Sequence, residues 1–170
     1  MNEFLTQIRG TLNYKLYYPA LYVCLTIPDI CGALESENGK ATPKKYIKWF
    51  NSHLGPKYAP SFDGENCWNF RCAMLHQGKS VHRRGTYNRV IFTEPEISGI
   101  SVHNCIFKVS SSVEVYCLDI KKFCQDMISG CEIWYNKMKD DNTFKKNYEN
   151  FIKPYPGGIS PFIHAKVVIG

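Results

Sequence analysis

The chain has 170 residues, of which 44% are hydrophobic and 21% are charged. This length is typical of one domain, and this composition excludes a disordered or fibrous protein. The 21 Lys and Arg residues against 15 Asp and Glu residues give a formal net charge of +6, which is compatible with an anionic partner. The apolar runs are shorter than the roughly 20 residues that a membrane span needs, so we expect a single soluble domain over residues 1–170 with no membrane partner.

The eight cysteines bear on the compartment and on metal binding. Residues 1–9 include an acidic residue and lack the apolar stretch of a signal peptide, so we expect a cytoplasmic protein with reduced thiols. No C-x-x-C pair occurs, and Cys117, Cys124 and Cys131 recur every seven residues, as small core residues can. Zinc needs ligands at short spacing on a turn, so neither a metal nor another cofactor is expected.

The first half of the chain is predicted to be helical, because its apolar residues recur at helical spacing. Pro28 should kink the second helix. Thr42 is typical of a helix N-cap and Gly78 of a helix stop, whereas residues 55–64 are rich in Pro and Gly and predict a loop. The helices are expected over residues 4–12, 19–34, 43–54 and 65–77.

The pattern then changes to short runs rich in Val, Ile, Phe and Tyr, which are typical of strands. Ser110 and Ser111 would join the last two strands as a hairpin. We therefore predict a small three-stranded antiparallel sheet inserted at about residues 88–118. The strands are expected over residues 88–94, 102–109 and 112–118.

A long amphipathic helix follows these strands. Asp119 is placed to cap it, and an apolar stripe extends from Ile120 to Met138. A shorter helix is expected at about residues 144–152, before a tail rich in Pro and Gly. The predicted fold is α+β and mainly α: a helical bundle with a three-stranded antiparallel sheet inserted before the last long helix.

Arginine is concentrated in one segment that contains no acidic residue. Four of the five arginines lie between residues 71 and 89, and no Asp or Glu occurs from Arg71 to Thr93. Because a guanidinium binds phosphate through two parallel hydrogen bonds, this segment predicts a nucleic-acid-binding surface, in which Tyr87 would stack on a base. The alternative is a solvated loop. The residues expected to contact nucleic acid are Lys79, His82, Arg83, Arg84, Tyr87 and Arg89.

The run from Arg71 to His76 places a histidine five residues after an arginine within a helical pattern. This spacing resembles the R-x4-6-H motif of the HEPN superfamily, whose members are helical bundles, often dimeric, and in many cases ribonucleases of toxin, antiviral defence or RNA-processing systems. The resemblance implies that Arg71 positions the scissile phosphate. It also implies that His76 acts as a general acid or base on the ribose 2′-hydroxyl without a metal.

A second resemblance covers most of the chain. Residues 26–35, 46–50 and 71–78 contain the patterns P-D-I-C-G-A-L-E, Y-x-x-W-F and R-C-x-x-L-H-Q-G, which resemble those of a widespread family of bacterial proteins without an assigned function. This resemblance therefore implies no activity.

Asp29 lies in an otherwise apolar helical segment and needs a partner. It would either orient His76 or pair with Arg71, and the alternative partner for Arg71 is Glu35. The alternative role of His76 is structural, as a residue that interacts with a helix C-terminus. On a straight helix, residues five apart point about 140° away from each other. Arg71 and His76 should therefore meet only across a helix end or with the help of a partner subunit.

Three functions are open at this point. The first is a metal-independent endoribonuclease that acts on RNA as a homodimer, with an antitoxin or another operon-encoded protein as a further partner. The second is a helical bundle that binds nucleic acid without cleaving it. The third is an interaction or regulatory module whose apolar faces form an oligomer, an assembly that salt would weaken much less than phosphate binding.

Overall fold

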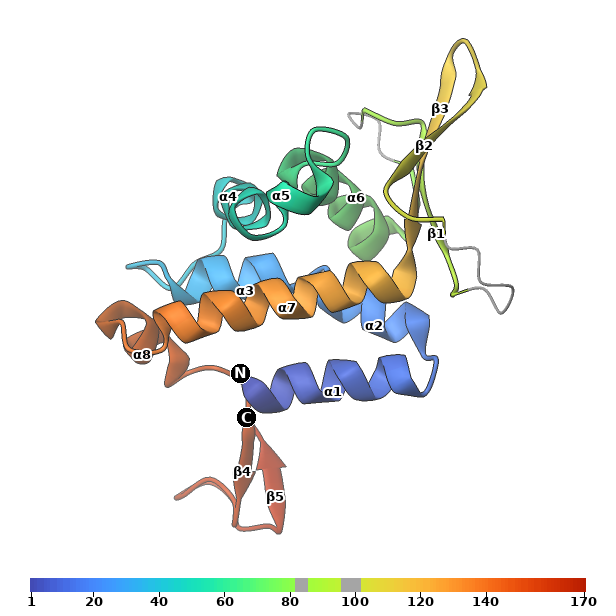
Figure 1. Ribbon diagram of the computed structural model, residues 1–170. Helices are drawn as coiled ribbons and strands as arrows, with labels where there is room; N and C mark the ends of the chain where they lie inside the picture. The colour runs from blue at the N-terminus through green and yellow to red at the C-terminus, as the bar shows by residue number, and fades with distance from the viewer. Residues whose placement is uncertain (82–85, 96–101) are drawn as a thin grey trace.

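The computed structural model describes residues 1–81, 86–95 and 102–170, and these form an α+β fold that is mainly helical (Figure 1). The helices are α1 (Asn2–Asn13), α2 (Tyr17–Cys24), α3 (Ile27–Leu34), α4 (Pro43–His53), α5 (Gly55–Tyr58), α6 (Gly64–Gln77), α7 (Ile120–Met138) and α8 (Asn142–Tyr148). The strands are β1 (Arg89–Thr93), β2 (Cys105–Ser110), β3 (Val113–Asp119), β4 (Pro154–Pro156) and β5 (Val167–Ile169).

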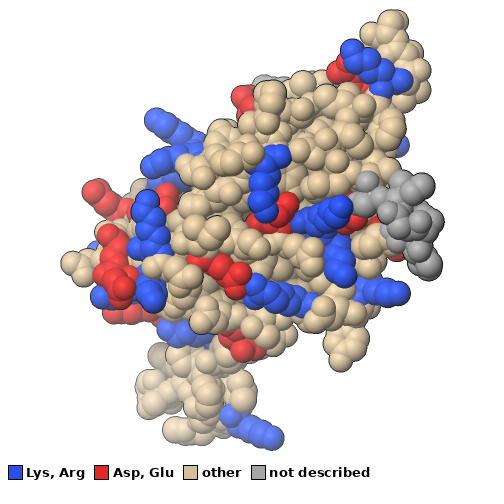
Figure 2. Space-filling view, in the orientation of Figure 1, with Lys and Arg blue, Asp and Glu red and all other residues tan. Residues whose placement is uncertain are grey.

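Helix α7 crosses the middle of the molecule and contacts α1, α2, α3 and α4 (Figure 1). The sheet of β1, β2 and β3 lies at one end of the bundle, and the β4–β5 hairpin projects near the two termini. On the face that Figure 2 shows, basic and acidic side chains are interspersed over the helical body, while the hairpin region is almost free of charge. That face therefore offers no large basic patch.

Local capping signals place several helix ends where the sequence predicts them. The hydroxyl of Thr42 accepts a hydrogen bond from the backbone N–H of Lys45, and the carboxylate of Asp119 accepts one from Lys122. Helix α6 stops at Gly78, whose φ of +62° lies in the left-handed region that favours glycine. The predicted caps and this helix stop are confirmed.

Three local predictions are wrong in detail. The segment 19–34 forms two helices, α2 and α3, rather than one kinked helix. Pro28 has no N–H and suits the first turn of a helix, so a new helix begins before it at Ile27. The predicted loop at 55–64 contains the short helix α5, and the C-terminal tail contains the antiparallel pair β4–β5.

The three-stranded sheet is mixed rather than antiparallel. Its strand order is β1-β3-β2, in which β1 is parallel to β3 and only β2 is antiparallel to it. The turn of the β2–β3 hairpin lies at residues 111–112. The connection between Thr93 and Cys105 is longer than a hairpin turn, so the chain can reach the far edge of β3. The most deeply buried strand, β3, thereby becomes the central one.

Sulfur atoms line the contact between α7 and the helices α2 and α3. Sγ of Cys31 lies 3.8 Å from Sγ of Cys131, and Sγ of Cys24 lies 3.8 Å from the carbonyl oxygen of Cys124. We call these four residues the sulfur seam. All eight cysteines lie in the described part of the chain and are free thiols. Burial raises the pKa of Cys24 and Cys31 well above the usual range.

Candidate functional site

Arg71 and His76 meet within one chain. Both lie on α6, and Nη1 of Arg71 is 3.0 Å from Nε2 of His76. The helix continues to Gln77, so neither a helix end between the two residues nor a partner subunit is needed for them to meet. The expectation that they diverge was wrong because it followed the Cα–Cβ directions, whereas the long arginine side chain reaches around the helix surface.

Arg71 also joins α6 to α3. Its Nη2 lies 2.7 Å from Oδ2 of Asp29, and both side chains are only 16% exposed. Oδ2 has no aligned hydrogen-bond donor among the described residues, so the attraction is mainly that of an ion pair. The guanidinium also lies over the Trp68 ring, 5.0 Å from its centroid. The other anticipated partner, Glu35, instead accepts a hydrogen bond of 3.0 Å from Nε1 of Trp134.

Burial and the arginine have opposite effects on Asp29. Burial raises the pKa of its carboxyl above the usual value, while the charge of Arg71 acts to lower that pKa. The raised pKa means that desolvation outweighs the attraction of the guanidinium. Asp29 thus depends on Arg71 as its charge partner inside the bundle.

His76 is exposed, in contrast to its two partners. An N–H of Arg71 can be donated to Nε2 only if that nitrogen is unprotonated, so the contact assigns the neutral ring a proton on Nδ1. The arrangement is an exposed imidazole beside a guanidinium that a buried carboxylate holds in place. We call Asp29, Arg71 and His76 the α6 triad. Such a group can bind an anion and move a proton at the same point.

Two of the predicted nucleic-acid contacts lie on adjoining segments. Lys79 follows the end of α6, Arg89 begins β1, and both side chains are exposed. The backbone N–H of Val90 donates to the carbonyl of Ser80 over 3.1 Å, which joins these segments directly. The predicted contacts His82, Arg83 and Arg84 lie outside the described residues.

Tyr87 cannot stack on a base as predicted. Its side chain is only 7% exposed, and its ring stacks on Tyr116 with the centroids 5.0 Å apart. Its hydroxyl donates to the carbonyl of Ser61. Tyr87 precedes β1 and packs between the sheet and the loop before α6, so it belongs to the core.

A second polar cluster has no signature in the sequence, because its members come from distant segments. Nδ1 of His103 accepts from the backbone N–H of Asp119 at 3.2 Å, and Nε2 lies 3.5 Å from the hydroxyl of Tyr58. That hydroxyl donates to Asp126 at 2.8 Å, and the ammonium of Lys57 binds the other oxygen of the same carboxylate. Burial raises the pKa of Tyr58 and lowers that of His103. The cluster joins α5 and α7 to the residues before β2.

The burial of His53 and His103 predicts that the folded protein loses stability in acid. Burial lowers the pKa of both His53 and His103 from the usual 6.5, so the unfolded chain binds more protons than the folded one at mildly acidic pH. The two neutral histidine rings should make their full contribution to the free energy of unfolding above about pH 6.5. That contribution should be lost as the pH falls from there through the pKa values of the folded state. Urea unfolding at pH 7.5 and 5.5 measures this effect, with a slope of at most about 1.4 kcal/mol per pH unit for each histidine.

The matched control removes the titrating rings. A His53→Gln, His103→Asn variant should be less stable at neutral pH but should depend less on pH, since an asparagine oxygen can still accept from Asp119. An unchanged pH slope in this variant would show that other groups cause the acid sensitivity.

Residues 1–81, 86–95 and 102–170 contain neither a metal-binding cluster of side chains nor a membrane-spanning helix. No group of three or more His, Cys, Asp and Glu side chains in these ranges could hold a metal ion. None of the helices described there has the length and apolar character that crossing a membrane requires.

Comparison of the chain with protein-family models, curated proteins and solved structures finds no match. The α6 triad and its surroundings are therefore the basis for the proposed function.

Proposed function

We propose that the chain is a metal-independent endoribonuclease of the HEPN type, in which His76 moves the proton and Arg71 positions the phosphate. The observation that carries this proposal is the 3.0 Å contact between Nη1 of Arg71 and Nε2 of the exposed His76. It supports the roles that the R-x4-H pattern implies, because it places a cation and a proton acceptor at one point of the surface. The exposed Lys79 and Arg89 would bind adjacent phosphates.

The reaction is an internal phosphoryl transfer. A phosphate that docks on Arg71 takes over the N–H that Nη1 donates to Nε2 of His76, which frees the lone pair of Nε2 to accept the proton of the neighbouring 2′-hydroxyl. As the proton passes to Nε2, the 2′-oxygen bonds to phosphorus and the bond from phosphorus to the 5′-oxygen breaks. The leaving 5′-oxygen takes a proton from the imidazolium or from water, which yields a 2′,3′-cyclic phosphate and a 5′-hydroxyl. Arg71 stabilises the charge that develops on the phosphate oxygens.

A second candidate function is nucleic-acid binding without cleavage. The ion pair between Arg71 and Asp29 favours it, because the guanidinium is 16% exposed and its charge is already offset. In this case the exposed cations would bind RNA in a salt-dependent manner, and His76 would have no chemical role. A homodimer suits either candidate, although the α6 triad is assembled within one chain.

The experiment that separates these candidates is incubation of the purified protein with total RNA in EDTA, with analysis of the product ends. We expect cleavage that leaves 2′,3′-cyclic phosphates, and a loss of roughly a hundredfold or more in His76→Ala. His164→Ala is the matched control, because His164 is also exposed but lies in the C-terminal tail. Cleavage by His76→Ala at the parental rate would refute the role of this histidine. Salt-dependent binding without cleavage would support the second candidate.

A further inference from the structure

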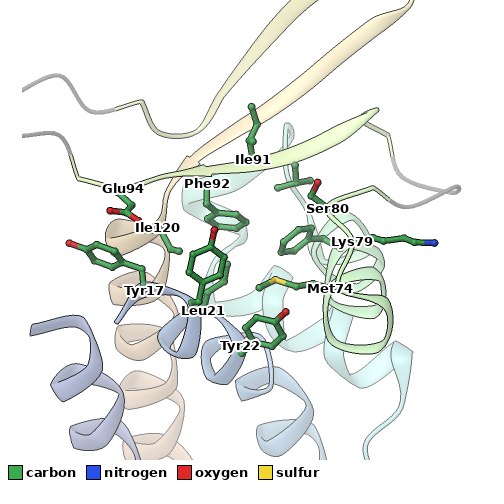
Figure 3. A pocket seen from close by; sticks show the side chains of 14 residues that line it. Tyr17, Leu21, Tyr22, Met74, Lys79, Ser80, Ile91, Phe92, Glu94 and Ile120 are labelled. Carbon is green, nitrogen blue, oxygen red and sulfur yellow. The ribbon is translucent and has the colours of Figure 1, made fainter. Parts of the chain in front are cut away.

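A pocket of about 260 Å³ lies between α2, the end of α6 and β1 (Figure 3). Its walls are largely aromatic and aliphatic, while the polar atoms at its edges come from Lys79, Ser80 and Glu94. We call it the α2–β1 pocket. Side chains that form its walls include Tyr17, Tyr22, Phe70, Met74, Phe92 and Ile120.

The pocket and the α6 triad share one helix. Phe70, Met74 and Gly78 are spaced four residues apart on α6, so they form a single stripe that faces the pocket. Arg71 follows Phe70 directly, whereas His76 comes two residues after Met74 and so faces away from this stripe. A strand held in the pocket would therefore have to pass around the C-terminal end of α6 to bring a phosphate to His76.

One cation and one anion, Lys79 and Glu94, flank the pocket. Both ends of the acid-free segment from Arg71 to Thr93 line it, and the hydrogen bond between Val90 and Ser80 joins them. In Figure 3 the ammonium of Lys79 extends away from the pocket, whereas Glu94 lies at the opposite end, near Tyr17. The interior of the α2–β1 pocket is therefore uncharged, and the ammonium of Lys79 lies outside it.

We propose that the α2–β1 pocket holds an unpaired nucleobase of the RNA strand, while Lys79 binds a neighbouring phosphate. This inference rests on the proposed function and names the form of the substrate as single-stranded RNA. Aromatic walls stack on any base, and the hydroxyl of Ser80 can hydrogen-bond to the edge of a base. A carboxylate accepts hydrogen bonds from an exocyclic amino group, so Glu94 favours cytosine over uracil, which carries a carbonyl at that position.

The test measures binding in the His76→Ala background, so that cleavage cannot interfere. Fluorescence anisotropy with labelled short oligo(C) and oligo(U) should show tighter binding of oligo(C). Tyr22→Ala should weaken binding of both between about fivefold and a hundredfold, which is the range for losing one base–aromatic stack. Tyr14→Ala is the matched control, because Tyr14 is 82% exposed and does not line the pocket.

A second variant guards against loss of folding in Tyr22→Ala. Met74 lines the pocket and extends into it from α6 (Figure 3), so Met74→Trp should fill the pocket without opening the core, and it should weaken binding as Tyr22→Ala does. Glu94→Gln should remove the preference for oligo(C). Circular dichroism and melting temperatures confirm that each variant is folded.

The outcomes separate this inference from the proposed function. Weaker binding in Tyr22→Ala and Met74→Trp, with normal binding in Tyr14→Ala, supports the pocket whether or not the parent protein cleaves RNA. Equal binding by all the variants overturns the inference even if the parent protein is a ribonuclease. Absence of oligonucleotide binding in the His76→Ala background also overturns it, while cleavage of total RNA in EDTA still decides the proposed activity independently.

Discussion

Replacing Arg71 with alanine should lower the free energy of unfolding by about 3 kcal/mol, because Asp29 would remain buried without its charge partner. Burial already raises the pKa of Asp29 with the guanidinium in place, so loss of the guanidinium should raise that pKa further, and the destabilisation should shrink as the pH falls and Asp29 takes up a proton. Urea unfolding at pH 7.5 measures the loss. The exposed ion pair of Arg9 with Glu132 provides the control, and Arg9→Ala should cost less than about 1 kcal/mol.

A double-mutant cycle tests the pairing itself. An apolar pair of similar size, Asp29→Leu with Arg71→Met, should be more stable than Arg71→Met alone, because no buried charge is left unpaired. If the two substitutions are simply additive, the ion pair does not explain the loss. The same data are needed to interpret any loss of RNA cleavage in Arg71 variants, since an unfolded protein is also inactive.

Gly64→Ala should destabilise the protein by at least about 2 kcal/mol. A Cβ atom at this position would lie 2.5 Å from the carbonyl oxygen and 2.9 Å from the Cα of Ile47. Both are backbone atoms of α4, so the clash can be relieved only by moving α4 away from α6. That movement would also stretch the 2.7 Å hydrogen bond from the backbone N–H of Gly64 to the side chain of Asn51. Chemical denaturation measures the effect.

Gly10→Ala is the matched substitution with the opposite expected sign. Gly10 lies within α1, and a Cβ atom there would meet nothing within 4 Å. Alanine in a helix interior is favoured over glycine by roughly 0.5–1 kcal/mol, so this variant should be more stable than the parent protein. Equal effects of the two substitutions would mean that close approach of α4 and α6 is not what requires glycine at position 64.

The helices could be predicted from the sequence because their signals are local. Thr42 caps α4 and Gly78 ends α6 through bonds and backbone angles that involve only neighbouring residues. The sheet shows the limit of this approach. Runs rich in Val, Ile, Phe and Tyr located β1, β2 and β3, but they could not show that β1 pairs with β3 in parallel, since that choice depends on contacts across the chain.

In the candidate site, too, the sequence shows what depends on neighbouring residues but not what depends on contacts between distant segments. Arg71 and His76 could be paired through the resemblance to the R-x4-6-H motif, although helix geometry alone predicted that they diverge. Asp29 could be identified as a partner because an acid in an apolar helix needs one. The cluster around His103 could not be found, because Tyr58 and Asp126 are far from it in the sequence. Tyr87 was misassigned because the sequence around a tyrosine in a basic segment does not show whether its ring packs in the core or faces solvent.

The sulfur seam determines where oxidative damage to this protein would begin. Thiolates, not thiols, react with peroxides, and burial raises the pKa of Cys24 and Cys31, which disfavours their thiolates. These two core thiols are therefore poor targets for oxidation. The partly exposed thiols are Cys72 and Cys105. Because Cys72 directly follows Arg71, oxidation of Cys72 would place a sulfur-bound oxygen next to a residue of the α6 triad.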